Sequence, residues 1–523
     1  MNDKQNTEEI SLLTKGKRGI LRILFSRIGI FLVIIALQIG IYVSIYRWFE
    51  SYFSWFNIAQ TIFVILMVIY LINCDMDATG KLTWLFIIML FPIAGTLFLW
   101  FTRQDPGHKT VKKRLFNLIR ESREYLSQEE GVLTDKELIY SGVDDLNRYM
   151  NRTGCFPVYK DTEIRYFPLG EDMFAAMCEE MQKAEKYIYM EYFIIQEGMM
   201  WGRLLKILAD KAAQGVDVRV MYDGMCDLSL LSSDYPQRMA TLGIKCKSFS
   251  PITPLVSTHY NNRDHRKILV IDGKVAFNGG VNLADEYINH IKVYGHWKDT
   301  AVMLKGKAAA SFTLMFLQMW NLTERTADWS ASKLTANTGS GEGYVIPYCD
   351  SPLDDDKVGE MVYCDILNRA KSYVHIMTPY LILDNELETA LKFAAERGVD
   401  VKLMVPGIPD KKMVYCLTRS YYKALLQAGV KIYEYTPGFV HAKVFVCDDE
   451  RAVVGTINLD YRSLYHHFEC ATYMYKTSCV ADIEKDYEET LAKCRKVDKG
   501  GIYRGNILGG IVGSVVKIFA PLM

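Results

Sequence analysis

One pattern of five spaced residues occurs twice in this chain of 523 residues. The first copy consists of His265, Lys267, Asp272, Gly279 and Asn282, and the second of His441, Lys443, Asp448, Gly455 and Asn458. The internal spacing of the two copies is identical. A single His-x-Lys occurs by chance in many chains, whereas two matched five-point patterns indicate an internal duplication.

A wider repeat surrounds both copies. Residues 215–221, Gly-Val-Asp-Val-Arg-Val-Met, recur at 398–404 as Gly-Val-Asp-Val-Lys-Leu-Met, each after a run of helical periodicity at 204–213 or 387–397. Strand-like runs at 187–195 and 373–383 precede those helices. Strands alternating with helices predict an α/β fold. The fold class expected is two tandem pseudo-symmetric α/β domains, each a mixed sheet flanked by helices, preceded by transmembrane helices.

The first hundred residues contain three apolar stretches, 28–46, 51–74 and 82–102, and each is about long enough, at ~20 residues, to cross a bilayer as a helix. Bulky residues after the first stretch disfavour a cleaved signal. Clusters of basic residues precede and follow the apolar block in the sequence. Three crossings would place the two clusters on opposite faces of the membrane, against the positive-inside tendency. Pro92 and Gly95 make the third stretch the candidate for a re-entrant path, and two to three crossings are expected.

These features divide the chain into six expected segments: a basic segment 1–27, a membrane anchor 28–102, a linker with a basic juxtamembrane helix 103–150, two α/β domains 151–335 and 336–505, and an apolar tail 506–523. The tail either lies in the headgroup layer or packs as an ordinary terminus. The expected location is the cell membrane, with several passes and the catalytic part in the cytoplasm.

Overall composition excludes two classes of protein. Lys+Arg and Asp+Glu both number 61, so the chain lacks the positive excess that a nucleic-acid-binding protein needs. Twelve cysteines occur singly, without a CxxC pair or zinc-ligand spacing, which indicates reduced thiols rather than disulfides or a metal site.

The spacing within each motif assigns its residues to positions. His265 and His441 should begin strands at 265–271 and 441–447, so that each histidine and the lysine two residues later share a face. Asp272 and Asp448 fall at hairpin turns and should support the site from behind. Asn282 and Asn458 should open helices, where an N-cap or an anion site forms.

If the two halves meet about a pseudo-twofold axis, their centre holds two imidazoles, two ammonium groups and two amides. This set suits a phosphodiester, because positive donors stabilise the non-bridging oxygens while one histidine attacks phosphorus and the other protonates the leaving alkoxide. The chemistry needs neither metal nor cofactor. The other histidines are interpreted as ordinary residues: His108, His259, His290, His296, His375, His466 and His467.

At these residues the chain resembles the phospholipase D superfamily, whose HKD motif begins at His265 and His441. It resembles bacterial cardiolipin synthases more closely, from about residue 56 to 523. The resemblance rests on Trp84, Pro92 and Gly95, on Thr378-Pro379-Tyr380, on Gly398-Val399-Asp400-Val401, and on His441-Ala442-Lys443 with Val454-Gly455-Thr456-Ile457-Asn458-Leu459-Asp460 and Arg462-Ser463. The first apolar stretch is additional to the two-helix pattern of that family.

The resemblance implies reversible phosphatidyl transfer between two phosphatidylglycerols, giving cardiolipin and glycerol through a phosphohistidine. It implies a catalytic set of His265, Lys267, Asp272, His441, Lys443 and Asp448, with Asn282 and Asn458 on the phosphate. His265 would be the nucleophile and His441 the acid and then the base, although a symmetric repeat leaves this order open. Asp299 and Glu469 follow the motifs and either orient a histidine or are surface acids.

Three alternatives stay open at this stage. Water as acceptor would make the protein a phospholipase D, and serine or another alcohol would make it a different phosphatidyltransferase, because the covalent half-reaction is shared. An inactive membrane lipid-binding scaffold would be favoured if either motif had lost its His or Lys, and neither has. The expected partners are phosphatidylglycerol and the bilayer, with no nucleic acid, and the sequence leaves the oligomeric state undetermined.

Overall fold

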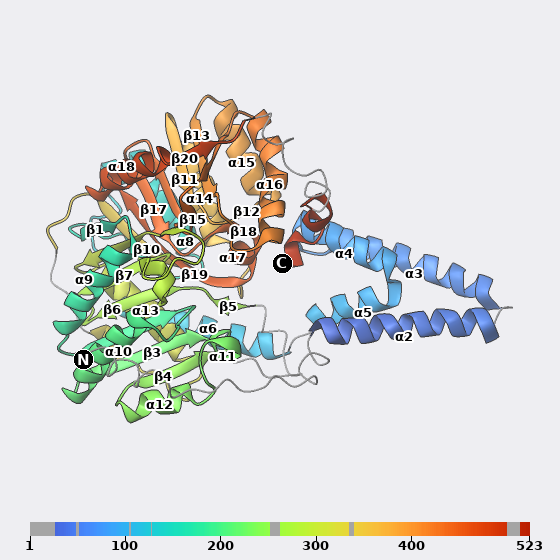
Figure 1. Cartoon of the computed structure of the whole chain (residues 1–523), viewed down its shortest axis with the longest axis horizontal. Coiled ribbons are helices and arrows are strands. Elements are labelled where there is room, and N and C mark those ends of the chain that lie inside the picture. Colours follow the sequence, from blue (N-terminus) through green and yellow to red (C-terminus); the bar gives the residue numbers. More distant parts are fainter. Residues whose placement is uncertain are drawn as a thin grey trace, which may run out of the picture.

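The computed structural model describes residues 27–48, 52–103, 106–126, 128–250, 262–333, 339–498 and 513–522. The basic segment expected over 1–27 lies outside the described residues except for Arg27, as does the first part of the tail. The described chain forms a globular body with two sheets, from which helices α2 to α5 project on one side (Figure 1).

The first half of the body contains a seven-stranded mixed sheet. In spatial order its strands are β1 (Glu163–Phe167), β9 (Ala301–Lys305), β7 (Val275–Gly279), β6 (Lys267–Ile271), β2 (Tyr187–Tyr192), β3 (Asp217–Asp223) and β4 (Lys245–Phe249). The β2–β3 and β3–β4 pairs are parallel and the others antiparallel. All six residues of β2 are buried, as expected of a central strand covered on both faces.

The second half repeats this order. Its strands run β10 (Tyr344–Asp350), β19 (His467–Tyr475), β17 (Arg451–Gly455), β16 (Val444–Cys447), β11 (Tyr373–Met377), β13 (Asp400–Pro406) and β14 (Lys431–Tyr435), with β20 (Cys494–Lys496) added at the edge. The parallel pairs are again those following the central strand, β11–β13 and β13–β14. The repeated sequence therefore folds into a repeated topology, as predicted.

Two short strand pairings join the halves. β5 (Arg263–Asp264), from the first half, pairs in parallel with the start of β19 in the second sheet. β15 (Gly438–Val440), from the second half, pairs in parallel with β8 (His296–Lys298) of the first half. In each half the segment just before the motif histidine therefore leaves its own sheet and joins the other half.

Helices cover both sheets. α9 (Gly170–Gln182), α10 (Met199–Ala213) and α12 (Tyr235–Thr241) pack on the first sheet, and α14 (Val358–Arg369), α15 (Asn385–Glu396) and α16 (Lys412–Gln427) on the second. Two further helices bridge the sheets. Helix α13 (Ala309–Trp320) contacts β2 and β6 of its own sheet and β10 of the other. Helix α18 (Cys479–Leu491) contacts β11 and β14 of its own sheet and β1 of the other. Every residue of α13 except Ala310 is buried, so this helix forms part of the core between the halves.

The motif aspartates lie in the hairpin turns that the sequence predicts. Asp272 and Gly273 both have positive φ, as do Asp448 and Asp449, which is the backbone that two-residue turns require. The Asp272 carboxylate accepts hydrogen bonds from the backbone amides of residues 185, 186 and 187 at 2.8 to 2.9 Å. The Asp448 carboxylate does the same for residues 371, 372 and 373 at 2.7 to 2.9 Å. Each aspartate thus fixes the start of the adjacent central strand.

Four helices form the projecting part: α2 (Arg27–Trp48), α3 (Phe53–Asn73), α4 (Ala78–Leu90) and α5 (Pro92–Arg103). Among the described residues, one helix, α3, is long and apolar enough by length and composition to cross a membrane. The third apolar stretch is broken at Phe91, and its two short helices pack against each other. A Cβ on Gly95 would lie 3.1 Å from the Ile87 carbonyl oxygen, so glycine permits this close return.

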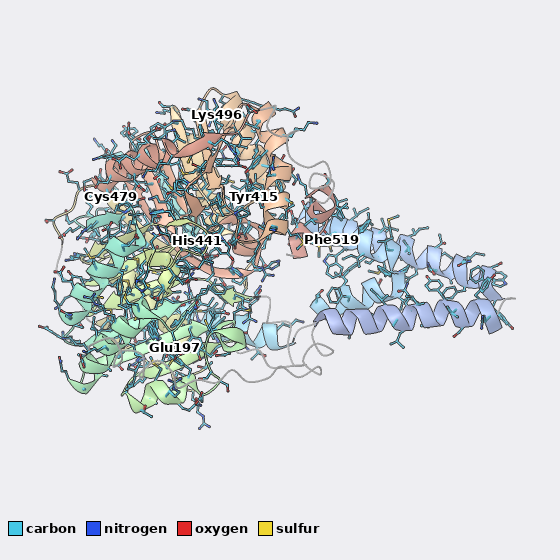
Figure 2. The ribbon with its side chains drawn as sticks, in the orientation of Figure 1. Glu197, Tyr415, His441, Cys479, Lys496 and Phe519 are labelled. Atoms are coloured by element: carbon cyan, nitrogen blue, oxygen red, sulfur yellow. The ribbon has the colours of Figure 1, made fainter. Side chains whose placement is uncertain are left out.

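The described end of the tail packs between the projecting helices and the body (Figure 2). Thr83 of α4 donates a hydrogen bond to the carbonyl of Ile518 at 2.6 Å, and the rings of Phe86 and Phe519 lie 5.9 Å apart. The Lys517 ammonium lies 3.8 Å from the centre of the Tyr421 ring on α16. These contacts fasten α4 to the second half of the body.

Candidate functional site

The two motif histidines lie where the halves exchange strands. The amide of His265 donates to the carbonyl of Phe468 at 2.9 Å, and the amide of His441 donates to the carbonyl of Lys298 at 2.7 Å. The strands predicted to begin at these histidines instead begin at Lys267 and Val444. The reason is that each histidine's backbone amide bonds to the opposite half rather than to its own sheet.

Each imidazole is bound by an acid of the other half. Nδ1 of His265 lies 2.8 and 2.9 Å from the two carboxylate oxygens of Glu469, and Nδ1 of His441 lies 2.6 Å from Oδ2 of Asp299. A carboxylate only accepts hydrogen bonds, so Nδ1 carries a proton in both rings. In the neutral ring this leaves the lone pair on Nε2, the atom available to attack or to exchange a proton.

Both carboxylates are completely buried and held in place. Thr456 donates its hydroxyl proton to Oε2 of Glu469, and the amide of Thr300 donates to Oδ1 of Asp299 at 2.9 Å. A Cβ on Gly280 would lie 2.0 Å from that same Oδ1, so glycine leaves room for the carboxylate. Asp299 and Glu469 are therefore buried partners of the histidines and not surface acids.

The two lysines are buried beside their histidines, each about 1% exposed. Nζ of Lys267 donates to the carbonyl of His265 at 2.6 Å. Nζ of Lys443 donates to the carbonyl of His441 and lies 2.8 Å from Nδ1 of the same ring. Both ammonium groups therefore lie next to an imidazole, as the spacing of two residues predicts.

Burial and positive charge together shift the pKa values of the site. Burial, followed by the charges of Lys267, Lys443 and His441, holds the pKa of His265 well below its usual range. Burial and Lys443 lower the pKa of His441 to about 4, against the opposing effect of Asp299. The mutual influence of the two motifs indicates that they share one electrostatic environment.

The lysine pKa values are lowered for the same reason. Burial lowers the pKa of Lys267 to about 8 and that of Lys443 to about 7, although Glu469 and Asp299 respectively favour the charged forms. Burial alone would raise the pKa of Asp299, but the charges of His441 and Lys443 outweigh it and lower that pKa. The site should therefore become more positive when an anion enters, because an anion stabilises every protonated group.

The motif asparagines do not open helices, and that prediction is wrong. A 3-10 turn begins at Asp285 after the first asparagine, and the five-residue helix α17 (Tyr461–Tyr465) follows the second, capped by Asp460. Asn282 instead accepts from the amide of Ile194 at 3.2 Å and donates to the Tyr287 hydroxyl at 2.8 Å. The residue after each asparagine pairs with a neighbouring strand, Leu283 with Ile195 and Leu459 with Leu381, so no helix begins there.

Asn458 differs from its counterpart. Its side-chain oxygen is buried and has no hydrogen-bond partner among the described residues. A buried polar atom without a partner is rare in folded proteins. The two asparagines are therefore equivalent in sequence but not in bonding.

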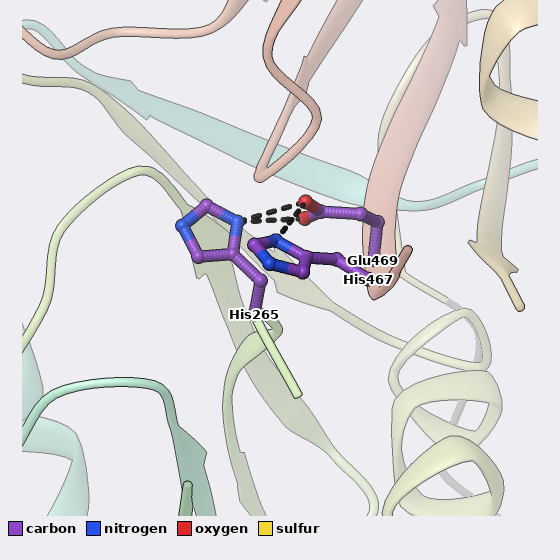
Figure 3. A group of neighbouring side chains, drawn as sticks. All are labelled: His265, His467 and Glu469. Atoms are coloured by element: carbon purple, nitrogen blue, oxygen red, sulfur yellow. Dashed lines mark hydrogen bonds and ion pairs between the residues drawn. The ribbon is translucent and has the colours of Figure 1, made fainter. Parts of the chain in front are cut away.

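Sequence reasoning missed one side chain at the site. His467 was interpreted as an ordinary histidine, yet its ring centre lies 5.2 Å from that of His265 (Figure 3). In the other half Trp297 lies 5.5 Å from His441 in the same way. Both residues stand two positions before the acid, so aligning the two segments around Asp299 and Glu469 would have paired them.

The chain is similar to known proteins over both of its halves. The family described as "Cardiolipin synthase, PLD-like domain" matches residues 177–320 and 363–491. A cardiolipin synthase of Geobacillus kaustophilus is 33% identical over 505 residues, covering 95% of this chain and 99% of its own. A protein of Streptococcus mutans, described only as uncharacterized, is 58% identical over 87% of this chain and 99% of its own.

A solved structure has the same fold. The crystal structure of phosphatidylserine synthase from Haemophilus influenzae superposes with a TM-score of 0.56 at 15% sequence identity, covering 73% of this chain and 98% of that one. At that identity the likeness concerns the arrangement of the two α/β halves. The family match over both halves and the cardiolipin synthase relatives show that this chain belongs to the cardiolipin synthase family of phospholipase D-like phosphatidyltransferases and is an enzyme.

Proposed function

We propose that this enzyme transfers a phosphatidyl group from one phosphatidylglycerol to another, forming cardiolipin and glycerol. The observation that carries the proposal is the crossed binding of the two histidines, His265 by Glu469 and His441 by Asp299. Two imidazoles, each bonded through Nδ1 to a buried carboxylate and lying beside two lysines, supply a nucleophile and an acid for one phosphodiester.

In the first step Nε2 of His265 attacks phosphorus, and the bond from phosphorus to the glycerol headgroup breaks. His441, in its protonated form, gives its proton to the departing alkoxide, so that free glycerol leaves. In the second step neutral His441 removes a proton from a glycerol hydroxyl of another phosphatidylglycerol, whose oxygen attacks phosphorus. The P–N bond breaks, cardiolipin forms, and His441 is again protonated.

The remaining motif residues have separate roles in this proposal. Lys267, Lys443 and the side-chain NH2 groups of Asn282 and Asn458 donate hydrogen bonds to the non-bridging oxygens. The unpartnered side-chain oxygen of Asn458 suits a glycerol hydroxyl, which would donate to it. Glu469 and Asp299 keep each Nδ1 protonated and each Nε2 directed at phosphorus. Asp272 and Asp448 act through the backbone, because their carboxylates bond the amides that start the central strands.

The contact between the site and the projecting helices favours a lipid acceptor. Tyr461 follows Asn458 by three residues, and its hydroxyl donates to Oδ2 of Asp77 at 3.3 Å. The same oxygen of Asp77 caps the start of α4. The second motif is thus attached to the apolar part of the chain, where phospholipid would be abundant and water scarce.

We also infer the course of the chain through the membrane. Helices α2 and α3 each cross the bilayer. Helices α4 and α5 have 13 and 12 residues, so each is only about 20 Å long at ~1.5 Å per residue, which is too short to cross. The pair therefore enters the bilayer and returns to the face from which it entered. This arrangement places both basic clusters and the catalytic body on one side, in keeping with the positive-inside tendency. That side would be the cytoplasm of a protein located in the cell membrane.

The arrangement in the membrane can be tested with cysteine labelling in intact cells. Tyr52→Cys, between α2 and α3, should react with a membrane-impermeant maleimide added outside. The native Cys74, after α3, should react only once the cells are opened. Three full crossings with the body in the cytoplasm would give the reverse pattern.

The reaction can be tested with radiolabelled phosphatidylglycerol as the sole lipid. Cardiolipin and glycerol should appear in equal amounts. His441→Ala should lower the rate by about 10²- to 10⁴-fold, as loss of a proton-transfer group does, and His265→Ala should abolish turnover, because it removes the nucleophile. The exposed His290→Ala is the matched control and should retain full activity. Phosphatidic acid as the main product would instead indicate a phospholipase D. Formation of phosphatidylserine when serine is added would indicate serine as the acceptor. No turnover would favour the inactive scaffold.

The order of the histidines can be tested with a phosphatidyl ester of p-nitrophenol, a leaving group that needs no acid. His441→Ala should release one equivalent of p-nitrophenol per enzyme and then stall as phosphohistidine. His265→Ala should release none, because it lacks the nucleophile. A burst from His265→Ala and none from His441→Ala would assign the nucleophile to the second half.

The pH dependence of kcat/KM follows from the pKa directions in the free enzyme. The lowered pKa of His265 means that this ring is neutral above the acid range, so activity should rise with pH well below pH 6.5. Activity should then fall in two stages. It should begin to fall from about pH 4, where His441, the acid of the first step, loses its proton in the free enzyme, and it should fall further along an alkaline limb near pH 7 to 8, as Lys443 and then Lys267 lose their protons. In Lys443→Arg the alkaline limb should move upward, since guanidinium stays charged; an unmoved limb would contradict this assignment.

A further inference from the structure

A third imidazole lies against the His265–Glu469 pair. His467 begins β19 two residues before Glu469 and is 7% exposed. Its Nδ1 lies 3.6 Å from Oε1 of Glu469, and neither ring nitrogen has a hydrogen-bond partner among the described residues. Figure 3 shows the two imidazoles on the same side of the Glu469 carboxylate. A buried imidazole with both nitrogens unpaired is an unused donor or ligand.

The geometry of these three side chains matches a metal site. One ligand atom each from His265, His467 and Glu469 can be chosen so that all lie within 4.8 Å of one another. Neighbouring ligands of a tetrahedral zinc ion, bound at about 2.0 to 2.2 Å, lie roughly 3.4 Å apart. The observed 2.8 Å between His265 and Glu469 and 3.6 Å between His467 and Glu469 bracket that value. Small side-chain rotations would therefore admit the ion.

The chemistry of the ligands selects the kind of ion. Two imidazoles and one carboxylate form a donor set that zinc enzymes use, with a fourth position open. Imidazole suits zinc and its neighbours, whereas magnesium and calcium prefer oxygen ligands. The nearby ammonium of Lys267 opposes any cation, so the affinity should be moderate and not that of a permanent cofactor.

Among the described residues, the position that the repeat relates to His467 holds no metal ligand. The residue two positions before Asp299 is Trp297, whose indole packs beside His441 where His467 packs beside His265. Indole is not a metal ligand. The pseudo-symmetric site is therefore able to bind a metal on the His265 side alone.

We propose that His265, His467 and Glu469 form an inhibitory site for Zn²⁺, which removes His265 from phosphatidyl transfer. The ion binds Nδ1 of His265 in place of its proton, and that proton moves to Nε2 of the same ring, which then has no lone pair with which to attack phosphorus. The inhibitory consequence rests on the proposed function, whereas the binding of the ion does not. Turnover in the absence of added metal needs no ion, so a chelator alone should leave it unchanged.

The inhibition is tested by titrating buffered Zn²⁺ into the full-length enzyme in phosphatidylglycerol vesicles. Micromolar Zn²⁺ should inhibit, EDTA should restore the rate, and Mg²⁺ at the same concentration should have no effect. Inhibition of each variant is expressed relative to its own rate without Zn²⁺. On this scale the Zn²⁺ concentration that halves the rate should be at least 10-fold higher for His467→Asn than for the wild type. Glu488→Gln, which removes a ligand of the separate group around His375 and Glu484, is the matched control and should keep wild-type sensitivity.

Binding is measured separately, so that the two proposals can fail independently. Co²⁺ added to the intact protein should give the visible absorption of a four-coordinate site, displaced by Zn²⁺, and both His467→Asn and His265→Ala should lose it. Binding without any phosphatidyl transfer would refute the proposed function alone. Zinc inhibition or cobalt absorption that is undiminished in His467→Asn would refute this site.

Discussion

The site depends on the exchange of backbone and side-chain hydrogen bonds between the two halves. His265 is bonded through its amide to Phe468 and through Nδ1 to Glu469, while His441 is bonded to Lys298 and Asp299. A hydrogen bond to a charged group contributes about 1.5 to 3 kcal/mol, and an unpaired buried carboxylate costs more than this. Neither half therefore orients its own histidine, and the arrangement of the two imidazoles exists only when both halves are assembled.

Burial gives this arrangement its electrostatic character. Two imidazoles with lowered pKa values and two lysines with pKa values of about 7 and 8 lie beside two buried carboxylates. Removing these groups from water disfavours their charged forms, and an entering phosphodiester reverses the effect because its negative charge stabilises them. The site is thus matched to an anion, and the added imidazole of His467 makes it asymmetric.

The projecting helices are joined to this site by a short path. The Tyr461 hydroxyl bonds Asp77 at the start of α4, and the tail residues Ile518 and Phe519 contact Thr83 and Phe86. These contacts connect α4 both to the segment that follows the second motif and to the tail. A lipid phosphate would thereby reach the histidines without leaving the vicinity of the bilayer, as the proposed transfer requires.

Regular spacing along the chain determined much of this protein. The repeat predicted two α/β halves, and the Asp272-Gly273 pair predicted a turn. Pro92 and Gly95 predicted the broken third stretch. Those features are local, because they depend on backbone conformation within a few residues. Only the tertiary structure decided that Glu469 bonds His265 and Asp299 bonds His441, that no helix begins at Asn282, and that His467 joins the site. These contacts connect residues that the packing of one sheet against the other brings together, and spacing along the chain carries no information about that packing.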